Sequence, residues 1–102
     1  MTTYPLSKQL SAFVDKTLSF NSTESSLSGL RQAYSQMCRA FTPPRPAGLY
    51  VVDFELAGVA VRSYQPPVAP ASGGVPCIVY LHGGGWVVGD LDSHDFICAE
   101  LA

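Results

Sequence analysis

Two stretches near the N-terminus place apolar residues at the spacing of one helix face. The first covers residues 6–18, where Ser7 is a candidate N-cap. The second follows a polar break at residues 21–26 and covers residues 27–41. Its apolar stripe consists of Leu27, Leu30, Tyr34, Met37, Cys38 and Phe41. The pattern therefore predicts two amphipathic helices, and their apolar stripe, Phe13, Tyr34, Met37 and Phe41, is interpreted as core rather than as a ligand-binding surface.

Three prolines, Pro43, Pro44 and Pro46, end the helical pattern and require an extended linker. The chain is therefore expected to divide into an N-terminal helical segment, residues 1–42, and a second unit, residues 43–102. Beyond the prolines the period falls to two. Apolar and polar residues alternate on both sides of Ala57 and Gly58, which predicts a β-hairpin with a tight turn.

A short run of apolar residues, Cys77–Leu81, shows no alternation, which predicts a central strand buried on both faces. A last helix is expected to begin near Ser93, with Asp92 or Ser93 as its cap and Asp95 in its first turn. That helix shows no C-terminal cap before Ala102. The order of helices and strands predicts an α/β protein, and the unfinished helix and unpartnered strand predict that it is a fragment.

Composition excludes several classes of protein. Of the 102 residues, 47% are hydrophobic and 14% charged, which is too apolar for a disordered chain. The net charge of −2 offers no basic surface for nucleic acid. No run of about 18 apolar residues exists to span a membrane, and no secretory signal is recognisable. Three widely spaced cysteines fit neither a disulfide framework nor a metal site, so a cytoplasmic location is expected.

Three consecutive glycines, Gly83–Gly85, directly follow the predicted strand. Such a loop at the carboxyl end of a strand can present bare N–H groups to a developing negative oxygen, as an oxyanion hole does. The spacing excludes two rival motifs: a dinucleotide-binding fingerprint would need Gly at Val88, and a P-loop would need Lys at Asp90.

The glycines stand in the run Tyr80-Leu81-His82-Gly83-Gly84-Gly85-Trp86, which is followed by Gly89, Asp90, Asp92 and Ser93-His94-Asp95. This run resembles the HGGG region of hormone-sensitive-lipase-like esterases. The segment Val61-Arg62-x-Tyr64-x-Pro66 and the two N-terminal helices also resemble that family. The resemblance implies the N-terminal portion of an α/β-hydrolase fold: helical cap, hairpin, first central strand and oxyanion loop. It assigns Gly84 and Gly85 as oxyanion donors and His82 and Gly83 as loop support, with no metal or other cofactor.

The catalytic triad of that family is absent from these residues. No serine has glycine on both sides at the spacing of a nucleophile elbow; Ser93 has Leu91 and Asp95 there. Ser93-His94-Asp95 imitates a triad in sequence, but neighbouring helical residues point about 100° apart, so capping is the favoured interpretation. We expect the nucleophile, acid and histidine in the remaining part of the fold, supplied as a continuation or a second polypeptide. The 102-residue chain alone is expected to be inactive and incompletely ordered.

The implied function is hydrolysis of small or short-chain carboxylic esters by a serine mechanism, with the helical segment over the mouth of the site. Trp86 and Phe13 are the candidates for a substrate pocket. Two alternatives remain open. One is a non-catalytic small-molecule-binding protein on the same scaffold, similar to plant gibberellin receptors, and the other is a free-standing interaction module.

Overall fold

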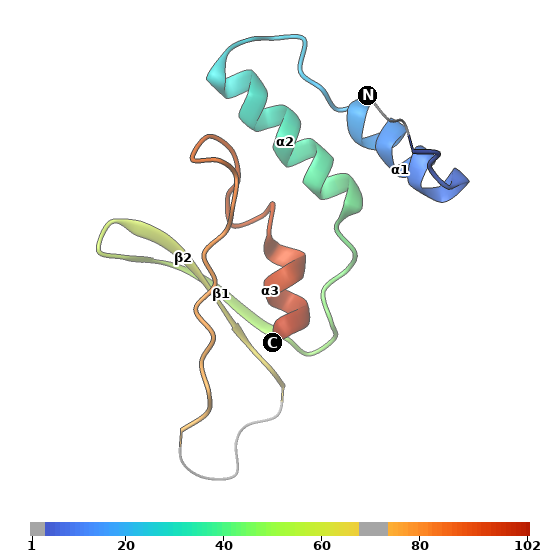
Figure 1. Cartoon of the computed structure of the whole chain (residues 1–102). Coiled ribbons are helices and arrows are strands. Elements are labelled where there is room, and N and C mark those ends of the chain that lie inside the picture. Colours follow the sequence, from blue (N-terminus) through green and yellow to red (C-terminus); the bar gives the residue numbers. More distant parts are fainter. Residues whose placement is uncertain (1–3, 68–73) are drawn as a thin grey trace.

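The computed structural model describes residues 4–67 and 74–102. In chain order the elements are α1 (Lys8–Leu18), α2 (Leu27–Phe41), β1 (Tyr50–Leu56), β2 (Val59–Gln65) and α3 (Asp95–Leu101). Helix α2 lies between α1 and the region where α3 begins, and the hairpin lies on the far side of α3 (Figure 1). The described parts of the chain thus contain the two N-terminal helices, the hairpin and the last helix that the sequence predicts.

Serine side chains begin both N-terminal helices. Ser7 Oγ accepts a hydrogen bond from Leu10 N at 3.1 Å, and Ser26 Oγ accepts one from Gly29 N at 3.1 Å. Each bond satisfies a backbone donor that has no partner within the helix. The predicted cap Ser7 is confirmed, and the second helix has the predicted bounds. The helices meet where the Phe13 and Phe41 rings lie 5.1 Å apart.

The hairpin forms in the predicted place. Strands β1 and β2 pair antiparallel, and Leu56 stands opposite Val59 across the turn. Both turn residues, Ala57 (φ 51°) and Gly58 (φ 80°), have left-handed backbone, as a two-residue type I′ turn requires. Strand β1 extends two residues beyond the predicted alternation at 52–56, and β2 extends one residue beyond that at 59–64. The turn is therefore encoded locally, although only Gly58 is a residue that prefers this conformation.

The prediction of a buried strand at Cys77–Leu81 is wrong for this structure. Residues 74–83 form no strand, and the side chains of Val79 and Leu81 are 82% and 87% exposed. The reason is the absence of a ladder partner, because the sheet within the described residues consists of β1 and β2 alone. An apolar strand without neighbours on either side has neither backbone hydrogen bonds nor a face to pack against.

The described residues form little hydrophobic core. Ala99 in α3 is the only apolar residue among them that is fully buried. The Cα radius of gyration is 17.4 Å, whereas a compact domain of this length has about 13 Å. The sequence favours the three cysteines as small buried apolar residues, and this is wrong for the structure, because Cys77 is exposed and Cys38 and Cys98 are only partly covered. None of the helices in residues 4–67 and 74–102 has the length and apolar character needed to span a bilayer.

The start of α3 differs from the prediction. Its N-cap is His94, whose side chain makes no capping hydrogen bond, so neither Asp92 nor Ser93 caps it. Ser93 instead closes a local turn: its Oγ accepts from Asp90 N at 2.8 Å, and its own N–H donates to Asp90 Oδ1 at 2.7 Å. Asp95 does lie in the first turn, as predicted.

Candidate functional site

The glycine loop forms a tight turn, and one position in that turn accommodates only glycine. The carbonyl oxygen of Gly84 accepts hydrogen bonds from Val87 N at 3.1 Å and Val88 N at 3.0 Å. Gly84 has φ +140°, and a Cβ there would lie 1.7 Å from the carbonyl oxygen of Val88. Glycine at position 84 is therefore a requirement of the turn itself.

The N–H groups of Gly84 and Gly85 are adjacent and donate to no protein acceptor within residues 4–67 and 74–102. Gly85 has φ +61°, and a Cβ there would meet no atom within 4 Å. A Cβ at Gly83 would likewise meet nothing. The loop thus contains two neighbouring backbone N–H groups without a protein acceptor among the described residues, and a Cβ at Gly85 would stand in open space.

His82 contacts the backbone of the glycine loop at Gly83 and Gly89. Its Nδ1 lies 2.8 Å from the carbonyl oxygen of Gly83 and donates to it in the corresponding tautomer. A Cβ at Gly89 would lie 2.9 Å from the same nitrogen, so the Gly89 backbone (φ +103°) passes directly against the ring. The rings of His82 and His94 are stacked with centroids 5.2 Å apart. The histidine therefore contacts both ends of the loop.

His94 touches Ser93, but the three neighbours Ser93, His94 and Asp95 form no triad. Ser93 Oγ lies 2.9 Å from His94 Nδ1, and the residue Ser93 is only 3% exposed, which leaves no room for a substrate carbonyl. The carboxylate of Asp95 is bound elsewhere. Burial, and next the neighbouring His82, lower the pKa of His94. The sequence-based rejection of this triad agrees with the geometry, although the serine closes a turn instead of capping a helix.

Asp95, which is itself buried, is the centre of an ionic cluster that joins the hairpin, the linker and α3. Arg45 binds it through two parallel bonds, Nε to Oδ2 and Nη2 to Oδ1, both 2.9 Å long. Arg62 Nη1 donates to Oδ1 at 2.9 Å, and the Tyr64 hydroxyl donates to the same oxygen at 2.7 Å. Burial alone would raise the pKa of Asp95, but the hydrogen bonds from Arg45, Tyr64 and Arg62 outweigh it and hold the pKa at about 2.

Arg62 extends this cluster to the segment that follows the glycine loop. Its Nη2 lies 2.8 Å from Asp92 Oδ1, and its Nη1 donates to the carbonyl oxygen of Leu91 at 3.2 Å. The guanidinium also pairs with Asp53 on the neighbouring strand. Hydrogen bonds to these carboxylates raise the pKa of Arg62, which stays charged at every working pH. One side chain thus fixes the far end of the loop to the hairpin.

Sequence reasoning missed this cluster, although one signal was present. The alternation in β2 puts Arg62 and Tyr64 on the same face of the strand, and Asp95 was expected in the first turn of a helix. Nothing in the pattern indicated that this polar face, rather than the apolar one, would be covered by α3. Arg45 gave no signal at all, because it lies among linker prolines.

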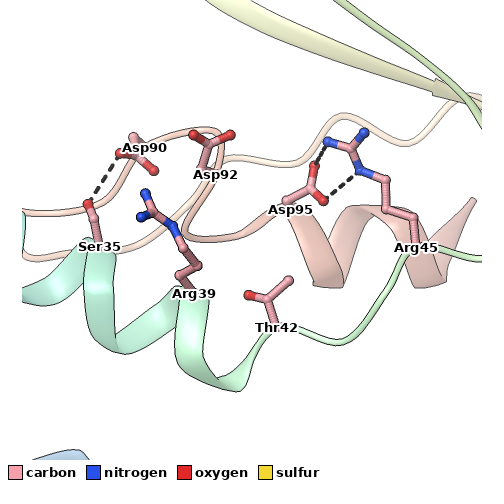
Figure 2. A pocket seen from close by; sticks show the side chains of 7 residues that line it. All are labelled: Ser35, Arg39, Thr42, Arg45, Asp90, Asp92 and Asp95. Carbon is pink, nitrogen blue, oxygen red and sulfur yellow. Dashed lines mark hydrogen bonds and ion pairs between the residues drawn. The ribbon is translucent and has the colours of Figure 1, made fainter.

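A polar cavity of about 220 Å³ lies between α2 and the segment 90–95 (Figure 2). Its lining residues are Ser35, Arg39, Thr42, Arg45, Asp90, Asp92 and Asp95. The predicted pocket residues are not brought together there. Phe13 packs on Phe41, and the Trp86 side chain is fully exposed, so their role in a substrate pocket stays a prediction. Within the described ranges no three His, Cys, Asp or Glu side chains gather as metal ligands.

Comparison with known proteins gives a family match that includes the glycine loop. A family model of the α/β-hydrolase fold matches residues 78–102, which contain the glycine turn and α3. Esterase LipI of Mycobacterium tuberculosis is 35% identical over 85 residues, 79% of this chain. The carboxylic ester hydrolase LipN of the same organism is 38% identical over 66 residues, 61% of the chain. The chain belongs to the hormone-sensitive-lipase-like family of α/β-hydrolases.

The match within this α/β-hydrolase family is locally strong and short. An ethyl acetate hydrolase of Pseudomonas putida is 58% identical over 43 residues, 41% of the chain. The aligned stretches cover 26% of LipI, 16% of LipN and 13% of the ethyl acetate hydrolase. The chain therefore spans about a quarter or less of the length of these relatives. With its helices, hairpin and glycine loop it represents an N-terminal portion of the α/β-hydrolase fold.

Proposed function

We propose that this chain supplies the oxyanion hole of a serine carboxylesterase that acts on small or short-chain esters. The observation that carries the proposal is the pair of adjacent N–H groups at Gly84 and Gly85, which have no protein acceptor in the described structure, in a loop where a Cβ at Gly85 would meet no atom within 4 Å. Three relatives are named as an esterase, a carboxylic ester hydrolase and an ethyl acetate hydrolase, which supports this reaction class.

In this reaction a serine from the remaining part of the fold attacks the ester carbonyl carbon, and its hydroxyl proton passes to the histidine expected in that same part. The carbonyl π-bond opens, and its electron pair becomes a negative charge on oxygen. The two glycine N–H groups then donate to that oxygen and stabilise the tetrahedral intermediate. Because the turn already fixes these donors, they need no reorganisation when the charge develops. The contact of His82 Nδ1 with the carbonyl oxygen of Gly83 supports the loop. We assign these two residues no part in proton transfer.

The test uses a fusion in which these 102 residues replace the matching segment of esterase LipI. Hydrolysis of p-nitrophenyl acetate and butyrate is measured for the unchanged fusion and for Gly85→Pro. Proline removes the N–H and cannot adopt φ +61°, so kcat should fall at least about 100-fold, the cost of one lost oxyanion donor.

Gly85→Ala is the matched control, because it keeps the N–H and places its Cβ in open space. It should retain most of the activity, with a loss of about tenfold at most from the left-handed backbone of alanine. Equal losses in both variants would assign Gly85 to loop shape, and full activity in Gly85→Pro would overturn the proposal. A folded fusion that binds esters but never hydrolyses them would favour the small-molecule-binding alternative.

A further inference from the structure

One face of α2 contacts the glycine loop. Arg31 Nε donates to the carbonyl oxygen of Val87 at 2.7 Å, and Ser35 Oγ donates to Asp90 Oδ2 at 3.4 Å. Between them, the Tyr34 ring lies 6.5 Å from that of His94. The spacing 31, 34, 35 is that of neighbours on one helix face. The helix therefore touches the loop at both ends of residues 87–90.

The bond from Arg31 reaches Gly85 through two planar peptide groups. The carbonyl of Val87 and the N–H of Val88 belong to one peptide unit, so a bond to the oxygen helps to fix the direction of the N–H. That Val88 N–H donates to the carbonyl oxygen of Gly84 at 3.0 Å. The carbonyl of Gly84 and the N–H of Gly85 form the next peptide unit. The positive guanidinium thus stands at the head of a hydrogen-bonded chain whose last free donor is Gly85 N–H.

We propose that Arg31 is a positioning residue that orients and polarises the Gly85 N–H through the Val87–Val88 and Gly84–Gly85 peptide units. The proposal rests on the oxyanion role of Gly85 given above. Hydrogen bonds in series strengthen one another, and a charged donor at the head pulls electron density along the chain, which makes the terminal N–H a better donor. Arg31 itself never touches the substrate.

The first test compares Arg31→Ala with Arg39→Ala in the LipI fusion. Both arginines are exposed on α2, and the Arg39 side chain makes no hydrogen bond or ion pair among residues 4–67 and 74–102. Arg31→Ala should lower kcat about tenfold and leave KM within about twofold, because the ester is bound equally well before charge develops. Arg31→Lys should recover part of the loss, since an ammonium group restores a charged donor without the fixed guanidinium geometry.

Two results would overturn the proposal. One is equal kcat in the two alanine variants, and the other is a raised KM with unchanged kcat, which would place Arg31 against the substrate. If even the unchanged fusion fails to hydrolyse esters, the proposed function fails, but the positioning role is still tested by amide hydrogen exchange. Arg31→Ala should speed exchange at Val88 N–H at least about fivefold over Arg39→Ala. Equal exchange rates would refute the role independently of activity.

Discussion

The hairpin at residues 50–65 and the apolar segment at residues 77–81 are both β-type sequences, yet only the hairpin forms a sheet. Strands β1 and β2 pair along their whole length through a two-residue turn. The segment 77–81 forms no strand, and side chains such as Val79 and Leu81 are exposed. The two strands of the hairpin pair residues that are 3 to 15 positions apart in the chain, whereas a central strand of an α/β sheet depends on strands distant in sequence. Local signals therefore suffice for one and not for the other.

The strongest test of this comparison is amide hydrogen exchange, residue by residue, in the chain alone and in the LipI fusion. In the chain alone the paired amides of β1 and β2 should exchange at least about tenfold more slowly than those of residues 77–81. In the fusion, protection of residues 77–81 should rise at least about 100-fold, because parallel neighbours then pair with both edges. Protected amides at 77–81 in the isolated monomer, with cooperative unfolding, would show that the fragment is a domain of its own.

The sequence predicted the parts of the molecule that local chemistry determines. Ser7 marks the beginning of the first N-terminal helix, and Ala57-Gly58 marks the hairpin turn. The glycine loop could be assigned to a family before its geometry was known, because few backbones need three glycines after an apolar run. The sequence did not indicate which side chains contact each other when they lie about 30 to 50 positions apart in the chain. The Arg45–Asp95 and Arg62–Asp95 pairs are of this kind.

The division into residues 1–42 and 43–102, with the first part acting as a cap, stays a prediction. The contacts of α2 with the loop, through Arg31 and Ser35, are compatible with it. The pocket role of Trp86 and Phe13 stays a prediction as well. Both depend on a substrate-binding surface that needs more of the hydrolase fold than these residues form.

Asp95 distinguishes the two regions further, because it joins the hairpin to α3 through hydrogen bonds from Arg62 and Tyr64. Its carboxyl carbon, followed by NMR, should titrate with a midpoint of about 2 in the native chain and near 3.8, its ordinary value, in urea. Since the folded pKa is lowered, the contribution to stability is present above about pH 4 and is lost as the pH falls toward 2. The shift corresponds to about 2 kcal/mol.

Arg45→Gln should raise the Asp95 midpoint, because it removes a charge and the bidentate bonds. Arg39 lines the same cavity without binding Asp95, so Arg39→Gln is the matched control. It should leave the Asp95 midpoint unchanged. Equal midpoints in the native chain, in urea and in both variants would mean that the cluster does not hold the hairpin on α3.

The smallest expected effect lies in the turn that lets the hairpin form by itself. Ala57 has φ 51°, a left-handed conformation that disfavours alanine, and its side chain is exposed. Asparagine tolerates this backbone and is preferred before glycine in type I′ turns, so Ala57→Asn should stabilise the hairpin by about 0.7 kcal/mol. That is about threefold slower exchange of the β1 and β2 amides, with residues 77–81 unaffected. Gly58→Ala, which forces a Cβ onto φ 80°, should speed the same amides by a similar factor. If Ala57→Asn instead slowed exchange at residues 77–81 as much as in the hairpin, the two regions would share one cooperative unit, and their difference in structure could not be assigned to local turn chemistry.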